Sequence, residues 1–294
     1  MSKVVKFGGS SLASAEQFKK VGNIIRAEKE RKYVVPSAPG KRDSKDTKVT
    51  DMLYSCYALA EAGKNFDKEL NQIKARYDEI IAGLDLKSGL LDAEFETVKA
   101  QFKAKAGKDY AASRGEYLNG IIMAEYLGYQ FLDAAEVIFF DEDGHFDAEK
   151  TQKVLSKRLE KKENAVIPGF YGSNPDGSIR TFSRGGSDIT GSIVSKACRA
   201  SMYENWTDVS GCLVADPRII DNPEPIKIIT YRELRELSYM GASVLHEDAV
   251  FPVRRAGIPI NIRNTNDPEA PGTLIVDTTC QKADYTITGI AGKK

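Results

Sequence analysis

Near the N-terminus, the residues Lys3-Val-Val-Lys-Phe-Gly-Gly-Ser-Ser11 carry the pattern from which the fold class follows. Their apolar first half predicts a strand over residues 3–7, and the glycine pair predicts a turn. A helix is expected from about residue 14 to residue 30, and a second strand at 33–35. Strand, helix and strand in this order predict a right-handed βαβ unit. The fold class is therefore α/β, a sandwich built on a mostly parallel sheet.

The remainder of the chain continues this pattern. Residues 50–127 are rich in Lys, Glu and Ala and are expected to be mainly helical, with the apolar run 118–127 against the core. Short apolar runs bounded by Gly, Pro, Asn or Asp are typical of buried strands in a wound sheet. They occur at 137–140, 165–167, 207–209, 258–262 and 273–276. A further strand-like run, 285–291, begins just before the sequence stops, and we expect a downstream domain to be missing.

Composition narrows the class of protein. With 294 residues, 41% of them apolar and 29% charged, the chain is long and apolar enough for a globular enzyme. The 42 basic residues balance 42 acidic ones, so no global field favours nucleic acid or an anionic membrane. The four widely spaced cysteines indicate neither a disulfide framework nor a cysteine zinc site, and two histidines exclude a three-histidine metal site. Neither a signal peptide nor an apolar run of membrane length occurs, which predicts a cytoplasmic protein.

A glycine-rich turn follows the first strand and is a candidate phosphate site. Gly8, Gly9 and Ser10 let backbone N–H groups approach a ligand, the next helix adds its positive end, and Lys6 adds a point charge. The spacing is neither that of a Walker A loop nor G-x-G-x-x-G. An ordinary tight turn between strand and helix has the same residues, so the spacing alone leaves both interpretations open.

A second glycine pair lies in Ser183-Arg-Gly-Gly-Ser-Asp188, ahead of a helix expected at 193–199. Arg184 is suited to hold a carboxylate through two hydrogen bonds. Asp188 has a simple alternative as a favourable charge at a helix N-terminus. Two such loops with fixed charges in one chain favour a functional interpretation over coincidence.

Other polar residues carry weaker signals. Glu116, in Ser113-Arg-Gly-Glu116, is a candidate for binding an ammonium group, although a helix-capping carboxylate is the stronger local interpretation. Four polar residues lie at a predicted strand end and in the turn after it: Thr207, Asp208, Asp216 and Arg218. This position suits a ligand site of an α/β sheet, but such residues are also ordinary in turns. His246 is expected to cap or pack a helix, and His145 to lie in a solvated loop.

The order of these motifs resembles that of the aspartokinases, a family of the amino-acid kinase superfamily. The matching motifs are KFGGSS at 6–11, SA-x-G at 37–40, SRGE at 113–116, PGF-x-G at 168–172, SRGGSD at 183–188 and TDV…DPR at 207–218. The resemblance implies the three-layer amino-acid kinase fold. It implies a catalytic domain over 1–282, whose N-terminal part binds aspartate and whose part from about 200 binds nucleotide. Residues 283–294 are then the stub of an ACT regulatory domain.

The resemblance implies that ATP phosphorylates the β-carboxylate of L-aspartate to 4-phospho-L-aspartate, the first step of lysine, threonine and methionine biosynthesis. Lys6 would contact the transferring phosphoryl group and Asp188 would orient Lys6. The loop Gly8, Gly9 and Ser10 would cradle the phosphoryl group. The resemblance assigns amino-acid binding to Ser37, Thr50, Glu116, Arg184 and Ser187, with Glu116 on the ammonium and Arg184 on the α-carboxylate. It assigns the nucleotide pocket to Thr207, Asp208, Asp216 and Arg218. Mg²⁺ would arrive with ATP without dedicated protein ligands, and the full-length protein would be a homodimer or larger homo-oligomer.

The chemistry agrees with the residues present. The attacking carboxylate is ionised at pH 7, so the reaction needs no general base and a chain with two histidines can perform it. It needs positioning and neutralisation of phosphoryl oxygens, which a lysine, loop amides and a metal supply.

The sequence also departs from the family pattern. The charged segment Lys41–Val49 lengthens a loop and is either a mobile lid or an insertion. Leu213, Ser243 and Glu247 stand where many relatives have an aromatic residue, a lysine and a proline, which puts single nucleotide contacts in doubt. Three alternatives stay open: a kinase of glutamate or carbamate, a regulator with a dead kinase site, and an NAD-dependent oxidoreductase, which lacks its glycine signature.

Overall fold

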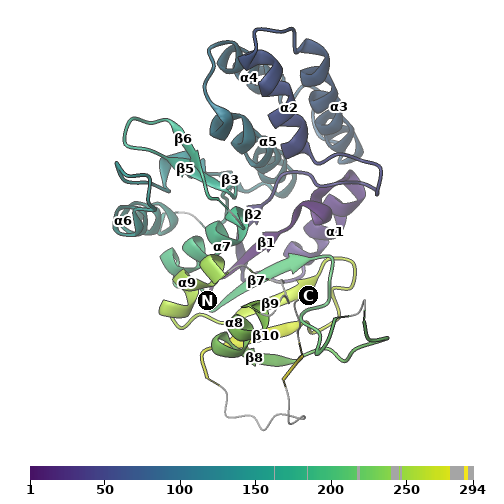
Figure 1. The fold of residues 1–294 in the computed structure, drawn as a ribbon, viewed down its shortest axis with the longest axis vertical. Helices are drawn as coiled ribbons and strands as arrows, with labels where there is room; N and C mark the ends of the chain where they lie inside the picture. The colour runs from purple at the N-terminus through teal and green to yellow at the C-terminus, as the bar shows by residue number, and fades with distance from the viewer. Residues whose placement is uncertain are drawn as a thin grey trace.

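The computed structural model describes residues 1–161, 163–183, 185–216, 219–239, 245, 247–278 and 288–290. Within them, an eight-stranded sheet has the order β3-β4-β2-β1-β7-β9-β10-β8 and crosses the middle of the molecule (Figure 1). Its pairings are parallel except that of β9 with β10. The strands are β1 (Lys3–Phe7), β2 (Arg31–Pro36), β3 (Gln130–Phe131), β4 (Ala165–Val166), β7 (Met202–Thr207), β8 (Ile228–Thr230), β9 (Ile260–Asn264) and β10 (Thr273–Val276). This confirms the α/β class with a mostly parallel sheet.

Two apolar cores, one on each face of the sheet, make the fold a three-layer sandwich. Side chains alternate along a strand, so Val4 and Val5 point to opposite faces and belong to different cores. One layer packs on the face of Val5 and holds α1 (Ala15–Arg26), α2 (Val49–Glu61), α3 (Asp67–Gly83), α4 (Asp92–Lys103) and α5 (Lys108–Leu127). The other packs on the face of Val4 and holds α6 (Ala148–Leu159), α7 (Gly186–Ala197), α8 (Tyr231–Tyr239) and α9 (Glu247–Arg255). Figure 1 shows α2 to α5 grouped at the top of the view.

The βαβ unit at the start of the chain is present as β1, α1 and β2. Ser14 caps α1, since its Oγ accepts from the N–H of Gln17 at 3.4 Å. The helix ends at Arg26, four residues before the predicted end. Arg31 caps this end, because its Nη1 donates to the carbonyl oxygen of Ile24 at 2.6 Å and satisfies a carbonyl of the last turn.

Several helices and strands lie at other residues than those predicted from the sequence. The strand predicted at 207–209 lies at Met202–Thr207 instead. Its middle holds Glu204, which is buried but paired with Arg31 at 2.8 Å and with the indole N–H of Trp206 at 2.9 Å, so a charged residue interrupts the apolar signal. In place of the strand predicted at 137–140, only Phe139 and Phe140 form isolated bridges. The helix predicted at 193–199 begins earlier, at Gly186. The strand predicted at 285–291 lies largely outside the described residues.

Some elements were not foreseen at all. They include β3, β8, helices α6 and α8, and an antiparallel hairpin of β5 (Tyr171–Ser173) and β6 (Ile179–Thr181). The helical prediction for 50–127 is confirmed, with four helices in that region. None of the helices in the described ranges combines the length and the apolar character needed to span a membrane.

Candidate active site

The glycine turn after β1 lies between the carboxyl ends of two neighbouring strands. The N–H of Gly8 donates to the carbonyl oxygen of Trp206 on β7 at 3.0 Å, and the N–H of Gly40, which follows β2, donates to Gly9 at 2.8 Å. Gly9 begins a short 3-10 helix, η1 (Gly9–Leu12). A Cβ on Gly40 would lie 2.6 Å from the carbonyl carbon of Gly9, so the two backbones meet too closely for a side chain. The turn is thus held at the edge where α/β sheets bind ligands.

Lys6 and Asp188 form a direct ion pair. Lys6 Nζ lies 2.6 Å from Asp188 Oδ1, and that same oxygen accepts from Asn205 Nδ2 at 2.8 Å. Tyr203 donates its hydroxyl to the carbonyl oxygen of Asp188 at 3.1 Å. Asp188 is therefore in direct contact with Lys6 and is more than a charge at the start of α7. Asn205 was not predicted, and its signal was a polar residue inside a buried strand.

A cleft of about 330 Å³ brings six of the predicted site residues together. We call it the central cleft. The six are Lys6, Ser37, Thr50, Glu116, Ser187 and Asp188. They come from β1, the segment after β2, α2, α5 and α7. The cleft is also lined by Lys48, Asp51, Phe170, Gly185 and Gly186, of which Lys48, Asp51 and Phe170 were not singled out as candidates. Lys48 stands at the N-cap of α2 and brings a second cation to the cleft.

Glu116 is a buried carboxyl group in the middle of α5. The helix begins at Lys108, so the helix-capping interpretation is wrong. Burial raises the pKa of Glu116 to about 8, although hydrogen bonds from backbone N–H groups and the charge of Lys6 work in the other direction. Its Oε2 accepts no hydrogen bond. A buried carboxylate oxygen without a donor is suited to receive an ammonium group.

Phe170 forms part of the cleft wall in an uncommon backbone conformation. Its φ is +82°, in the left-handed region that residues with a side chain rarely adopt. The surroundings hold it there, since its N–H donates to Thr190 Oγ1 at 3.0 Å and its carbonyl oxygen accepts from the N–H of Phe182 at 2.9 Å. Such conformations cluster at ligand sites. The bend places Phe170 beside Gly186, at the start of α7.

The segment Lys41–Val49 is tied to α3. Asp46 Oδ2 accepts from Arg76 Nη1 at 2.8 Å and from Arg42 Nε at 3.0 Å, and Arg76 Nη2 donates to the carbonyl oxygen of Gly40 at 3.2 Å. Burial raises the pKa of Asp46, but the hydrogen bonds from Arg42 and the charge of Arg76 outweigh it and hold the pKa well below its ordinary value. These contacts anchor the segment to α3 and disfavour the interpretation as a mobile lid.

Asp46→Asn is expected to free this segment. Loss of the charge-assisted hydrogen bonds costs about 1.5–3 kcal/mol, which makes the open segment roughly ten to a hundred times more populated. Limited proteolysis with trypsin, which cleaves after Lys and Arg, should therefore cut between residues 41 and 48 faster in the variant at pH 7. The contribution of Asp46 to stability is lost as the pH falls below its ordinary pKa of 3.8, so there the unfolding free energies of the two proteins should converge. Equal cleavage rates at pH 7 would contradict the anchoring role.

Thr207 and Asp208 follow Trp206, whose carbonyl oxygen binds the first glycine turn, but neither they nor Asp216 line the central cleft. Thr207 ends β7, and its hydroxyl donates to Asp208 Oδ1 at 3.2 Å. The carbonyl oxygen of Asp216 accepts from the N–H groups of Ile219 and Ile220 at 2.9 and 3.0 Å, in a turn. Arg184, Arg218, Ser243 and His246 lie outside the described residues, as does the side chain of Glu247.

Other predicted residues are at the surface. Leu213 is 36% exposed and forms an isolated bridge with Pro225. The side chain of His145 is 81% exposed, as predicted for a solvated loop.

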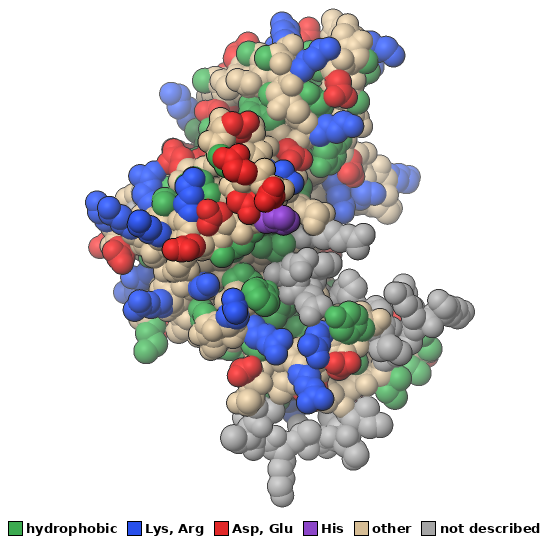
Figure 2. Space-filling view, turned by 60° about the vertical axis from the view of Figure 1, so that its left-hand side comes forward, with side chains coloured by type: hydrophobic (Ala, Val, Ile, Leu, Met, Phe, Trp, Pro, Cys, Tyr) green, Lys and Arg blue, Asp and Glu red, His purple; other side chains and the backbone are tan. Residues whose placement is uncertain are grey.

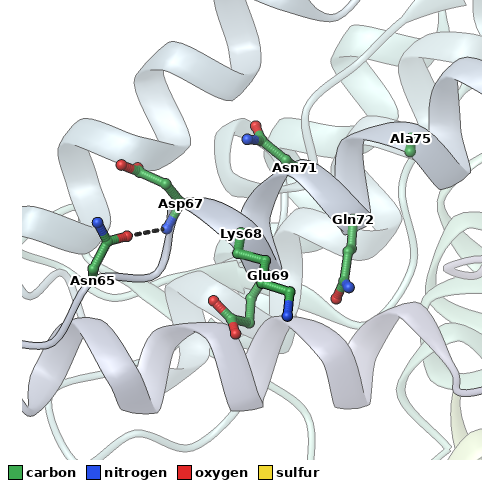
Figure 3. A pocket seen from close by; sticks show the side chains of 7 residues that line it. All are labelled: Asn65, Asp67, Lys68, Glu69, Asn71, Gln72 and Ala75. Atoms are coloured by element: carbon green, nitrogen blue, oxygen red, sulfur yellow. Dashed lines mark hydrogen bonds between the residues drawn. The ribbon is translucent and has the colours of Figure 1, made fainter.

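A hollow at the start of α3 is lined by Asn65, Asp67, Lys68, Glu69, Asn71, Gln72 and Ala75. Figure 3 shows that these side chains point in different directions, so the hollow brings no reactive groups together.

The chain is similar to known proteins over most of its length. The model of the amino acid kinase family matches residues 1–264. Aspartokinase 3 of Bacillus subtilis (strain 168) is 39% identical over 98% of this chain and 66% of its own length. Chloroplastic aspartokinase 1 of Arabidopsis thaliana is 32% identical over 94% of this chain and 52% of its own length.

Two solved structures have folds similar to that of this chain. The aspartate kinase of Clostridium acetobutylicum has a TM-score of 0.93 at 56% identity, over 98% of this chain and 66% of that one. Aspartokinase III of E. coli, in complex with aspartate and ADP, has a TM-score of 0.82 at 26% identity, over 95% of this chain and 65% of that one. The chain thus spans just under two thirds, or less, of the length of these relatives.

Proposed function

Because the chain belongs to the amino acid kinase family, we propose that it transfers the γ-phosphoryl group of ATP to the β-carboxylate of L-aspartate, giving 4-phospho-L-aspartate. The observation that carries the proposal is the convergence of Lys6, Asp188 and Glu116 in one cleft. The names of the relatives support the substrate, and the E. coli relative holds aspartate and ADP together.

The protein would recognise the amino acid by its ammonium group and its α-carboxylate. Glu116 would receive the ammonium group on its unpaired oxygen, and Arg184 would hold the α-carboxylate, as the family resemblance implies. Hydroxyl groups of Ser37, Thr50 and Ser187 line the same cleft and would complete the contacts. The β-carboxylate is ionised at neutral pH and attacks without a general base, so these residues act by positioning.

The phosphoryl group would be stabilised by Lys6 and by backbone N–H groups. Lys6 is held by Asp188 and faces the cleft, while Gly8, Gly9 and Ser10 would cradle the phosphates beside it. Thr207, Asp208, Asp216 and Arg218 would bind the rest of the nucleotide. Mg²⁺ would enter with ATP, bound largely through phosphate and water oxygens, and would neutralise phosphate charge.

The biological setting is proposed with the reaction. We infer a cytoplasmic role in the first step of lysine, threonine and methionine biosynthesis. Residues 1–282 would form the catalytic domain, with the nucleotide-binding part from about residue 200. We also expect a homodimer or larger homo-oligomer, which light scattering coupled to size-exclusion chromatography measures.

An acyl-phosphate trap tests the proposal. The protein is incubated with Mg-ATP and hydroxylamine, together with L-aspartate, L-glutamate or carbamate in parallel, and the hydroxamate is measured. We expect ATP-dependent aspartyl hydroxamate alone. Product with L-glutamate alone would replace the substrate and keep the reaction class. No product, although calorimetry shows ATP and aspartate binding, would favour the regulator with a dead site. Glu125→Gln serves as an active control, since Glu125 is exposed on the far part of α5.

Two glycine substitutions separate ligand binding from folding. A Cβ on Gly8 would lie 3.7 Å from its nearest neighbours, Lys6 Nζ and the carbonyl oxygen of Trp206, so Gly8→Ala should fold normally. It should nevertheless raise the KM for ATP by about tenfold, because the methyl group stands where phosphate would lie; that is about 1.4 kcal/mol. Gly40→Ala should lower both the unfolding temperature and kcat, because its Cβ overlaps Gly9. An unchanged KM for ATP in Gly8→Ala would place the phosphates elsewhere.

A further inference from the structure

A second, larger cleft lies beside α7, between it and helices α6 and α9. Its volume is about 590 Å³, which suits a small organic ligand. We call it the α6–α7 cleft. It is enclosed by α6, β6, α7, α9 and the segment between residues 140 and 148. In Figure 2, which brings this side of the molecule forward, hydrophobic side chains lie together with Lys and Arg side chains on this face.

The interior of the α6–α7 cleft is apolar. Phe182 stacks at a tilt on Phe140, with ring centroids 5.1 Å apart, and meets Phe146 edge-on at 5.9 Å. Ile189 and Ile193, from successive turns of α7, continue this surface. A ring or a branched hydrocarbon fits such a wall, whereas a bare inorganic ion would lose its hydration there without replacement.

The polar lining carries an unbalanced positive charge. Arg180, Lys196 and Arg255 line the cleft, and none of them pairs with a carboxylate among the described residues. No Asp or Glu lines it in the part of the chain that the structure describes. Arg180 and Arg255 instead lie over the rings of Phe140 and Phe251, at 5.8 and 5.1 Å from their centroids. His145 at the rim is 3.7 Å from Asp141, which offsets its charge if it is protonated.

We propose that the α6–α7 cleft binds a small organic anion. Its anionic head would face Arg180, Lys196 and Arg255, and its apolar body would pack on Phe182, Ile189 and Ile193. The inference is independent of the proposed function, because none of these residues lines the central cleft. The two clefts nevertheless share one helix, since Ser187 and Asp188 at the start of α7 face the central cleft.

The test uses 3-phenylpropionate as the probe and 3-phenylpropanol as its neutral counterpart. Binding is followed by NMR of the chain labelled at the isoleucine δ-methyl groups, in the absence of ATP and aspartate, so that the result does not depend on the kinase activity. The signals of Ile189 and Ile193 are assigned with Ile→Val variants. We expect both signals to shift with a dissociation constant on the order of 1 mM, as for a fragment of this size.

Variants then assign the head group. The double variant Lys196→Met with Arg255→Met should weaken binding at least tenfold. Lys153→Met is the matched control, because Lys153 is exposed on α6 but does not line the cleft, and it should bind as the wild type does.

Three results would overturn the proposal. Equal binding of 3-phenylpropanol would show that the charge is not used. Displacement of the probe by L-aspartate, without shifts of Ile189 and Ile193, would place it in the central cleft. Unchanged spectra at about 10 mM probe would show that the cleft has no such ligand class.

Discussion

Glu116→Gln is expected to raise the KM for L-aspartate by roughly two orders of magnitude, with a smaller effect on the KM for ATP. The neutral amide keeps the volume of the side chain but removes the charge that we assign to the substrate ammonium. Loss of one partner of a buried charged pair costs about 2–5 kcal/mol. Steady-state kinetics with varied aspartate measures the change, and Glu125→Gln on the exposed part of the same helix is the control. An unchanged KM for aspartate would remove Glu116 from the substrate site.

The same variant should change how stability depends on pH. Because burial raises the pKa of Glu116 to about 8 from 4.5, the folded protein without ligand holds a proton that the unfolded chain releases. Stability from this group is complete below pH 4.5 and is lost as the pH rises through 8. Above that pH, Glu116→Gln should therefore be more stable than wild type, by roughly 3–5 kcal/mol. Thermal unfolding from pH 6 to pH 9 measures this, and parallel curves for the two proteins would contradict it.

Aspartate binding should then release a proton. At pH 7 the carboxyl group of Glu116 is mostly protonated, and an incoming ammonium group favours its ionised form. Calorimetry in buffers with different ionisation enthalpies should report the release of close to one proton for each aspartate bound at pH 7. The release should be absent in Glu116→Gln.

Lys6→Met should lower kcat by about a hundredfold to a thousandfold, as is typical when a group that stabilises transition-state charge is removed. The KM for aspartate should change far less, because Lys6 is assigned to the phosphoryl group. Methionine keeps most of the side-chain volume, so the buried site is filled. Lys29→Met, at an exposed position after α1, is the control. An unchanged kcat would show that Lys6 does not meet the phosphoryl group.

Asp188→Asn tests whether Lys6 and Asp188 act together in catalysis. Since Asp188 Oδ1 contacts Lys6 at 2.6 Å, the variant should lower kcat mainly by releasing Lys6. The double variant Lys6→Met with Asp188→Asn should then be little worse than Lys6→Met alone. Fully additive losses would mean that Asp188 acts independently of Lys6.

The fold was predictable where apolar pattern and glycine agreed. β1, α1, β2 and β10 form where their periodicity and turns predict them, β10 at residues 273–276, although α1 ends four residues early. The predicted position of β7 was wrong because Glu204 and Asn205 are buried in the middle of the strand and interrupt its apolar pattern. Burial of these polar side chains is possible because Arg31 and Asp188, on other elements, bind them. The β5–β6 hairpin was missed because each strand has three residues, too few to show a period.

The site was predictable only in part from local patterns. Spacing identified Lys6 and the glycine pairs, but the contact between Lys6 and Asp188 joins residues far apart in the sequence. The resemblance supplied their partnership, and the structure adds Asn205 as a further contact. Lys48 and Phe170 were missed because an exposed lysine and an aromatic residue after a glycine are ordinary in sequence. The local pattern around Glu116 favoured a cap, since sequence does not show burial.

The position of β1 in the middle of the sheet has a consequence during translation. Lys3 pairs with Met202, 199 residues later, while β2 covers the opposite edge early. At about 5–20 residues per second, the ribosome needs roughly 10–40 s to make the intervening chain. For that time the edge of β1, with its valines Val4 and Val5, has no native partner and offers unpaired backbone groups to other nascent chains. We therefore expect the yield of native protein in cells to depend on chaperones that cover this edge until β7 emerges.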